Sequence, residues 1–261
     1  MKLGIVGATG WLGQALGLGL LRRGLVAPGD LVVLNRSGRR GGYEAYPGVV
    51  WAQNLAEMQA QCEIVVLSVR PQDFPIAGFD PGARLVISFL TGWTMARLRA
   101  LAPQAPLVRA MPNGGASTGQ SYTPWLADGV DAAEEARVAQ ILSVMGTQER
   151  IETEDQLDYL TALSGSGAAY PALMARAMLA DAAARGLPEA VARRAVEAVI
   201  CGSSGLLAGQ MGGVQDLLDT YMSYHGVTAA GLTAAQNAGF EEAVRAALGA
   251  ATKTARAMGQ E

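Results

Sequence analysis

The stretch that decides the fold lies near the start of the chain, at residues 3–13, and reads LGIVGATGWLG. Its first four residues form an apolar run typical of a buried strand, and a helical pattern begins after the glycines. In such a strand–turn–helix unit, Gly7 permits a tight turn, Gly10 lets backbone approach a pyrophosphate, and Gly13 allows close packing of helix on strand. The pyrophosphate is expected at the helix N-terminus. The predicted cofactor contacts in this turn are Gly7, Ala8, Thr9, Gly10, Trp11 and Leu12.

Further apolar runs follow at residues 31–34, 62–69, 84–89 and 106–111, and helical patterns separate most of them. Continuous rather than alternating apolar runs are typical of a parallel sheet that is covered on both faces. Asp131 and Glu134 form a predicted capping box at the start of another helix, which Gly146 is expected to end. A short edge strand is expected near residues 149–152.

The character of the sequence changes after about residue 154, where alanine, leucine, methionine and glycine recur at helical spacing. Helices are predicted at residues 155–163, 168–185, 188–208, 214–222, 228–237 and 240–258. These helices carry more apolar surface than one face needs, which indicates burial against another subunit. We therefore predict a Rossmann-type, doubly wound parallel sheet at residues 1–154, followed by an all-α dimerisation and substrate domain at residues 155–261.

Composition excludes several classes of protein. Half of the residues are apolar and the formal net charge is −3, so neither a nucleic acid nor an anionic membrane is an expected partner. No apolar run approaches the roughly 18 residues of a membrane span, and the start of the chain does not resemble a signal peptide. Cys62 and Cys201 lie far apart without a ligand-like neighbourhood, so no metal site is predicted. We expect structural thiols and a cytoplasmic location.

The end of the second predicted strand bears on the choice of cofactor. A site for NAD usually places Asp or Glu there to bind the ribose hydroxyls, whereas this chain has Asn35, Arg36 and Ser37. A guanidinium and a hydroxyl can bind a 2′-phosphate, and no carboxylate at these positions repels it. The sequence favours NADPH over NADH, with Arg36 as the main contact and Asn35, Ser37 and Arg39 as helpers. The alternative is an ordinary solvated basic loop.

Four segments together resemble the pyrroline-5-carboxylate reductase family, whose members reduce a cyclic imine acid to proline with NAD(P)H. They are the glycine turn, VRPQ at residues 69–72, VRAMPN at residues 108–113, and ALSGSGAAY at residues 162–170. The resemblance covers nearly the whole chain. It implies an all-helical domain that forms a homodimer, with active sites between the cofactor domain and the helical domains.

The resemblance also implies roles for individual residues. It assigns Ser68, Val69, Arg70 and Pro71 to a segment along the dinucleotide, and it assigns Asn54 to the adenosine side. Met111, Pro112 and Asn113 correspond to the segment beside the nicotinamide, where Asn113 also reaches the substrate. Ser166 lies in a glycine-rich kink where backbone can approach a ligand, although close packing of helices explains that kink equally well.

Residues 223–228, SYHGVT, match the substrate loop of the family, which typically reads Ser-Pro-Gly-Gly, a variable residue and Thr. Ser223, Gly226 and Thr228 are kept, Tyr224 and His225 are changed, and Val227 occupies the variable place. Backbone N–H groups of Gly226, Val227 and Thr228 at a helix N-terminus would form a cradle for a carboxylate.

Thr228 is the first catalytic candidate, as a hydroxyl donor to the substrate or simply as the cap of that helix. His225, the only histidine of the chain, is the second, as a proton donor or an ordinary loop residue. Whether His225 or Tyr224 takes part in proton transfer is open at this point, as are the exact imine and the stereochemistry.

Three functions remain. The first is an NADPH-dependent oxidoreductase that reduces a cyclic imine carboxylate, with 1-pyrroline-5-carboxylate as the expected substrate. The second is an imine reductase of specialised metabolism that acts on a different or larger cyclic imine, which the altered Tyr224 and His225 would suit. The third is a non-catalytic NADPH sensor.

Overall fold

The computed structural model describes residues 1–36, 38, 41–74 and 76–259. The chain forms two compact units, one of Met1–Gly167 with Ala251–Glu261 and one of Ala168–Ala250. Each unit is described by itself below. The predicted domain boundary between residues 154 and 155 stays a prediction.

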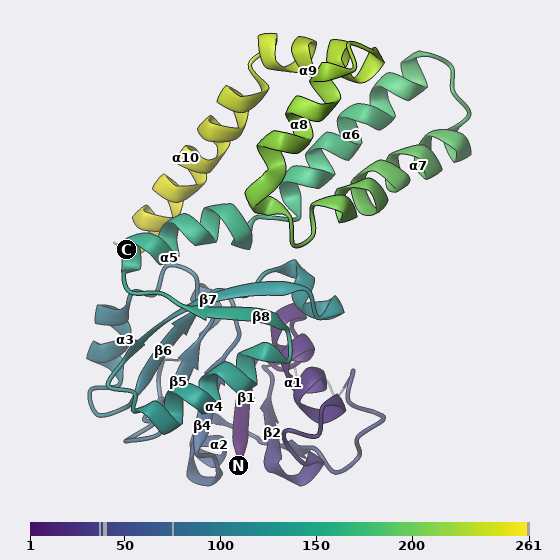
Figure 1. Ribbon diagram of the computed structural model, residues 1–261. Coiled ribbons are helices and arrows are strands. Elements are labelled where there is room, and N and C mark those ends of the chain that lie inside the picture. Colours follow the sequence, from purple (N-terminus) through teal and green to yellow (C-terminus); the bar gives the residue numbers. More distant parts are fainter. Residues whose placement is uncertain (37, 39–40, 75, 260–261) are drawn as a thin grey trace. The chain divides into compact units, whose positions relative to one another are not determined.

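The first unit is built on one sheet, in which the described residues form eight strands (Figure 1). In chain order they are β1 (Leu3–Val6), β2 (Leu31–Leu34), β3 (Val50–Trp51), β4 (Ile64–Leu67), β5 (Leu85–Ser88), β6 (Leu107–Ala110), β7 (Ser121–Asp128) and β8 (Gly146–Arg150). Their spatial order is β3-β2-β1-β4-β5-β6-β7-β8. Strands β1 to β6 run parallel, β7 is antiparallel to β6, and β8 is parallel to β7. The doubly wound, mostly parallel sheet confirms the predicted fold class.

Both faces of this sheet are covered, because successive strand residues point to opposite sides. Leu3 and Ile5 pack with α1 (Trp11–Arg22) and α4 (Ala132–Ser143), whereas Val6 packs with α2 (Leu55–Gln61) and α3 (Met95–Leu101). The β1–α1 connection is the glycine turn. Because strands β1 to β6 run parallel, their carboxyl ends meet at one edge of the sheet, where the connecting turns can form a binding cleft.

Two sequence expectations about β8 need correction. Helix α4 has the predicted capping box, but it ends at Ser143, and Gly146 begins β8 instead of closing the helix. Gly146 has φ +144°, and a Cβ there would lie 2.1 Å from the Ser121 carbonyl oxygen, so glycine is required by strand pairing. The predicted edge strand near residues 149–152 lies at Gly146–Arg150.

Strands β3 and β7 were not predicted from the sequence. Strand β7 contains Pro124, and proline inside a strand usually argues against a strand because it lacks an N–H donor. Here the Pro124 carbonyl still accepts a hydrogen bond from the Met111 N–H at 3.0 Å, so the strand keeps its pairing with the segment after β6.

Helix α5 (Glu154–Leu160) leaves the sheet and continues into a π-helical turn at Thr161–Gly165. It begins with a second capping box, formed by Thr153 and Gln156. The π-helical turn contains Ala-Leu-Ser-Gly, residues 162–165, the first part of the motif at residues 162–170.

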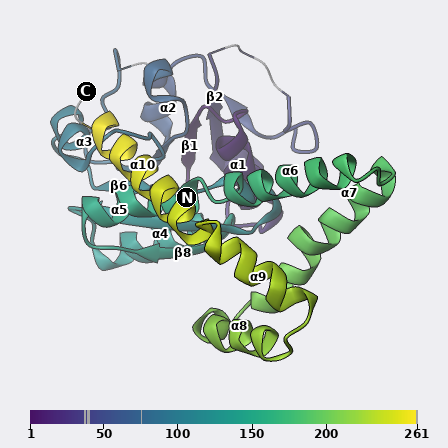
Figure 2. The same cartoon turned by 90° about the horizontal axis from the view of Figure 1, so that it is seen from above.

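The second unit is helical. It contains α6 (Ala169–Ala184), α7 (Glu189–Glu197), α8 (Val214–Ser223), α9 (Val227–Asn237) and the first part of α10 (Phe240–Met258). Helices α6 and α7 lie side by side, as do α8 and α9 (Figure 1, Figure 2). The predicted helix at residues 188–208 is α7 followed by a π-helical and a 3-10 turn. Within the part of the chain that is described, no helix is long and apolar enough to cross a membrane.

Candidate dinucleotide and imine site

The glycine turn has the geometry that the sequence predicts. Gly7 has φ +83°, a conformation that side-chain-bearing residues rarely adopt, and a Cβ there would lie 2.2 Å from the Ser68 carbonyl oxygen. A Cβ on Gly13 would lie 2.4 Å from the Gly7 carbonyl oxygen. The turn thus brings the start of α1 against β1 as closely as glycine allows, and the first N–H groups of the helix have no partner within it.

Two side chains brace this turn from outside it. The Asn35 amide donates to the Thr9 hydroxyl, and the Thr9 N–H donates to Asn35 Oδ1 at 3.3 Å. The buried Tyr43 hydroxyl donates to the Ala8 carbonyl at 3.0 Å, and burial raises the pKa of this phenol. Asn35, predicted as a helper in phosphate binding, is therefore tied to the turn. Tyr43 was not predicted; its only sequence signal is Gly17, whose missing side chain leaves room for the phenol ring.

A cleft of about 580 Å³ opens above the turn, outside the carboxyl ends of β1, β4 and β5. It is lined by Gly7, Gly10, Trp11, Leu12, Arg36, Ser68, Val69, Arg70, Pro71, Asp73, Phe89 and Thr91. All but Asp73, Phe89 and Thr91 were predicted from the sequence. Phe89 and Thr91 follow β5, so their place after a parallel strand was the signal that could have found them.

The residues of this cleft fit a dinucleotide. The glycines leave backbone unobstructed at the N-terminus of α1, a 12-residue helix whose dipole favours an anion there. Arg36 is the second residue after β2, in the region where the ribose 2′ group of a dinucleotide is recognised in such folds. Ser37 and Arg39, also predicted as phosphate contacts, lie outside the described residues.

A carboxylate joins the two arginines of the cleft. Asp73 Oδ1 lies 2.7 Å from Arg36 Nη1, and Asp73 Oδ2 lies 2.6 Å from Arg70 Nε. The arginine side chains are 79% and 70% exposed, and that of Asp73 is 21% exposed. The hydrogen bonds from Arg70 and then from Arg36 hold the pKa of Asp73 below its ordinary value.

The Met-Pro-Asn segment after β6 packs against the π-helical turn. Asn113 Nδ2 donates to the Ser164 carbonyl at 2.9 Å, and Asn113 Oδ1 accepts from the Gly115 N–H at 2.9 Å. Gly165 faces Met111, with 3.7 Å between the place of a Cβ and Met111 Cγ. Two of the four motifs that carry the family resemblance are therefore in contact within the first unit.

Trp11 connects the glycine turn with this second segment. A Cβ on Gly114 would lie 3.3 Å from the Trp11 ring, so the ring covers the first residue after the Met-Pro-Asn segment. The indole is 68% exposed and lines the dinucleotide cleft.

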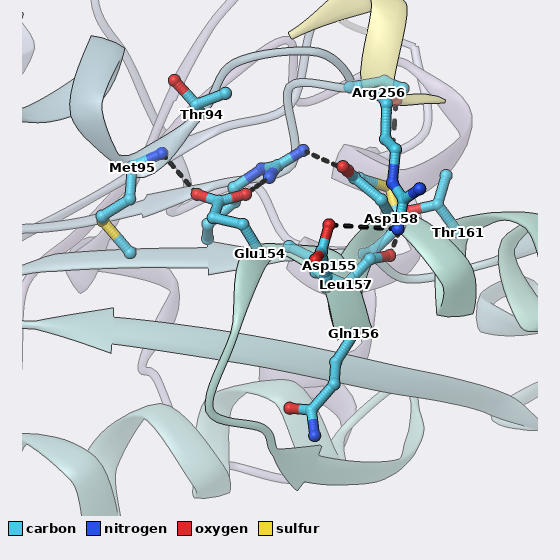
Figure 3. Close-up of polar contacts among 12 residues, drawn as sticks. Thr94, Met95, Glu154, Asp155, Gln156, Leu157, Asp158, Thr161 and Arg256 are labelled. Carbon is cyan, nitrogen blue, oxygen red and sulfur yellow. Dashed lines mark hydrogen bonds and ion pairs between the residues drawn. The ribbon is translucent and has the colours of Figure 1, made fainter. Parts of the chain in front are cut away.

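An ionic group is centred on β6, the strand that leads into the Met-Pro-Asn segment, and Figure 3 shows its carboxylates Glu154 and Asp158. Arg109 of β6, whose side chain is 2% exposed, forms an ion pair with Glu154 and lies 3.7 Å from Asp158 Oδ1. Glu154 also accepts the Met95 N–H at 2.6 Å. Burial lowers the pKa of the Arg109 guanidinium, and Asp158 opposes that shift. Sequence reasoning gave no role to Arg109, because its two partners follow it by more than 40 residues.

Two predicted site residues have other contacts. Asn54 is the N-cap of α2, where its Oδ1 accepts the Glu57 N–H at 2.9 Å, and it does not line the cleft. Ser166 follows the π-helical turn, and its N–H donates to the Thr161 carbonyl at 3.1 Å. Their predicted roles toward a ligand stay predictions.

The predicted substrate loop, residues 223–228, spans the last residue of α8, an exposed turn at residues 224–226 and the first two residues of α9. Gly226 is the N-cap of α9 and no side chain caps this helix, so the alternative role of Thr228 as the cap is wrong. Thr228 is instead the second residue of the helix. His225 has φ +50° and is the only non-glycine residue of the described chain with a positive φ.

The loop belongs to the second unit and the dinucleotide cleft to the first. Their meeting in one active site therefore stays a prediction. Within its own unit, the loop presents Tyr224, 73% exposed, and Val227, 92% exposed. The N–H groups of the first turn of α9 have no partner in their own helix, as at every helix start, which keeps the predicted carboxylate cradle chemically possible.

The known proteins that this chain resembles in sequence and in structure include several pyrroline-5-carboxylate reductases. Residues 154–258 match the family model of pyrroline-5-carboxylate reductase dimerisation. A pyrroline-5-carboxylate reductase of Synechocystis sp. is 30% identical over all of this chain and 99% of its own length. One of Thermus thermophilus is 32% identical, with 95% of this chain and 96% of that protein covered. The crystal structure of Plasmodium falciparum pyrroline carboxylate reductase with NADP bound superposes with a TM-score of 0.85, at 26% identity, covering 99% of this chain and 98% of that one.

Proposed function

The chain belongs to the pyrroline-5-carboxylate reductase family, and from that premise we propose that it reduces 1-pyrroline-5-carboxylate to proline with NADPH. The observation that carries the proposal is the cleft over the glycine turn, which combines an open helix N-terminus with Arg36, the second residue after β2. The similarity over the full chain supplies the substrate class. The contact of Met111 and Asn113 with the π-helical turn supports a reaction site beside this cleft.

The bound cofactor supplies the hydride, which is delivered to the imine carbon. The work of the protein is then to bind and orient two molecules. Gly7, Gly10 and the first turn of α1 would hold the pyrophosphate, and Arg36 would bind the 2′-phosphate that distinguishes NADPH from NADH. Trp11, which lines the cleft, and Met111, which belongs to the Met-Pro-Asn segment, would limit the position of the nicotinamide ring.

The substrate is an anion with a C=N bond, and residues 223–228 suit both features. N–H groups at the start of α9 bind the carboxylate, and the Thr228 hydroxyl donates to the substrate. His225 lies next to this cradle and can hold a proton for the imine nitrogen, since a protonated imine is the better electrophile. We further propose a homodimer through the helical unit, in line with the match to a dimerisation model, and a cytoplasmic location.

The test is steady-state kinetics with purified protein, NADPH and either 1-pyrroline-5-carboxylate or its six-membered homologue, with proline or pipecolate identified as product. We expect proline formation and a preference for the five-membered ring. Absence of turnover with both imines would refute the proposal and would favour a cofactor sensor.

A second candidate is supported by Tyr224 and His225, which differ from the resemblance pattern. The left-handed backbone of His225 shows that the loop keeps a conformation suited to glycine while carrying a large side chain. Such a loop fits a reshaped pocket for a larger imine. A higher kcat/KM on the six-membered or a larger cyclic imine than on 1-pyrroline-5-carboxylate would establish this alternative.

A further inference from the structure

The carboxylate of Asp73 lies between the two arginines of the dinucleotide cleft. It contacts Arg36 Nη1 at 2.7 Å and Arg70 Nε at 2.6 Å, so both of its oxygens are used by the two arginines of the cleft. Asp73 comes from the turn after β4, and no feature of the sequence marked it as part of a site. It is nevertheless one of the residues that line the same cleft as the glycine turn.

Arg36 and Arg70 form a site that could bind an anion, and the carboxylate of Asp73 occupies it. A carboxylate and a phosphate bind a guanidinium through the same kind of charge-assisted hydrogen bonds. A 2′-phosphate that binds Arg36 must therefore displace Asp73 or lie beside its negative charge. A ribose 2′-hydroxyl carries no charge and meets no such competition.

Displacement is feasible because the arginines are mostly exposed. Ion pairs in contact with water contribute little to stability, and a phosphate with more charge forms the stronger pair with the same guanidinium. Asp73 thus weakens binding of the 2′-phosphate without blocking it.

We propose that Asp73 is a specificity-determining residue that competes with the 2′-phosphate of NADPH for Arg36 and Arg70, and so lowers the preference of this enzyme for NADPH over NADH. The inference rests on the proposed function, since it assumes that the cleft binds a nicotinamide dinucleotide. It goes beyond that function because it assigns to Asp73 a role that opposes binding of the 2′-phosphate by Arg36 and Arg70.

The test measures binding directly. Calorimetric titrations with adenosine 2′,5′-bisphosphate and with adenosine 5′-monophosphate isolate the 2′-phosphate from the rest of the dinucleotide. Asp73→Asn removes the charge but keeps the size of the side chain. Asp128→Asn is the matched control, because Asp128 forms an ion pair with Arg99 at 2.7 Å and does not line the cleft.

We expect Asp73→Asn to bind the bisphosphate about three- to fivefold more tightly than the unchanged protein, the upper part of the range for exposed charge pairs. Its affinity for the monophosphate should change less than twofold, and the ratio of kcat/KM for NADPH to that for NADH should rise in parallel. Asp128→Asn should leave both affinities unchanged.

Weaker binding of the bisphosphate by Asp73→Asn would overturn the inference, because Asp73 would then serve to hold the arginines in place for the phosphate. Equal binding by Asp73→Asn and the unchanged protein would also overturn it, yet would leave the proposed function intact. If the unchanged protein bound neither nucleotide nor NADPH, the proposed function would fail together with the inference.

Discussion

Two groups of arginines and carboxylates in the first unit share the same chemistry but differ in their surroundings. In the cleft, Arg36, Asp73 and Arg70 are joined by contacts of 2.6 and 2.7 Å with the arginines largely in water. Behind the Met-Pro-Asn segment, Arg109 is 2% exposed and pairs with carboxylates of α5. Water lowers the cost of breaking the first group, whereas a broken second group leaves charges with few other partners.

The exposure of the arginine side chains therefore distinguishes an ionic group that can exchange its partners from one that holds the structure together. The exposed group can release its arginines to a phosphate, so it can take part in binding. The buried group holds β6 to α5, and α5 leads into the turn whose Ser164 carbonyl accepts from Asn113. Arg109 is therefore a positioning residue, remote from the reacting atoms.

The largest expected effect comes from Arg109→Met. The substitution leaves Glu154 and Asp158 without their cation. Because these carboxylates are 37% and 14% exposed, we expect a cost of about 2 kcal/mol, below that of a fully buried pair. Urea unfolding should show this loss. Arg150→Met, which breaks the more exposed pair with Glu135, is the control and should cost less than about 1 kcal/mol. Equal losses in the two variants would show that the burial of Arg109 has no special consequence.

Arg36→Ala should mainly change cofactor binding. Loss of one charge-assisted hydrogen bond to the 2′-phosphate is expected to raise the dissociation constant for NADPH about 10- to 100-fold, with less than a threefold change for NADH. Fluorescence titration of the two reduced cofactors measures both values. An equal loss for NADPH and NADH would mean that Arg36 does not recognise the 2′-phosphate.

The exposed arginines of the cleft and the buried Arg109 should also differ in their sensitivity to salt. Raising NaCl from about 0.05 to 0.5 M shortens the Debye length to a few ångströms and should weaken NADPH binding several-fold. The difference in unfolding free energy between the unchanged protein and Arg109→Met should stay nearly constant, because buried pairs are screened much less. A salt-insensitive affinity for NADPH would contradict the role given to the exposed arginines.

The smallest expected effect concerns pH. The pKa of Asp73 in the folded protein lies below its usual 3.8, so the carboxylate is ionised and paired above that value and loses its pairing only as pH falls through the lowered pKa. Between pH 6 and 9 the ratio of bisphosphate affinities of Asp73→Asn and the unchanged protein should therefore be constant. The phosphate's own titration affects both proteins alike. A ratio that approached one within this range would contradict competition by an ionised Asp73.

Local features of the site could be predicted from the sequence because each depends on a few neighbouring residues. The glycine turn, the Arg36 position and the capping box of α4 are of this kind. Asp73 and Arg109 could not be predicted in this way. Asp73 meets Arg36 across 37 positions of the sequence and Arg109 meets Glu154 across 45, so only the sheet topology brings them together.

The remaining differences also have physical reasons. Strand β7 contains Pro124 and was missed, because its pairing comes from strands on both sides rather than from its own propensity. Thr228 was assigned a possible capping role, but the N-cap of α9 is Gly226, two residues earlier. The link between residues 223–228 and the cleft rests on the family resemblance and stays a prediction.

The most direct test of the proposed reaction follows the hydride itself. NADPH deuterated at the transferable position of nicotinamide C4 is incubated with the protein and 1-pyrroline-5-carboxylate, and the product is analysed by mass spectrometry. The account predicts proline that carries one deuterium, at the ring carbon that was bonded to the imine nitrogen by the double bond. Proline formed without deuterium, or no proline above the level of a protein-free control, would contradict it.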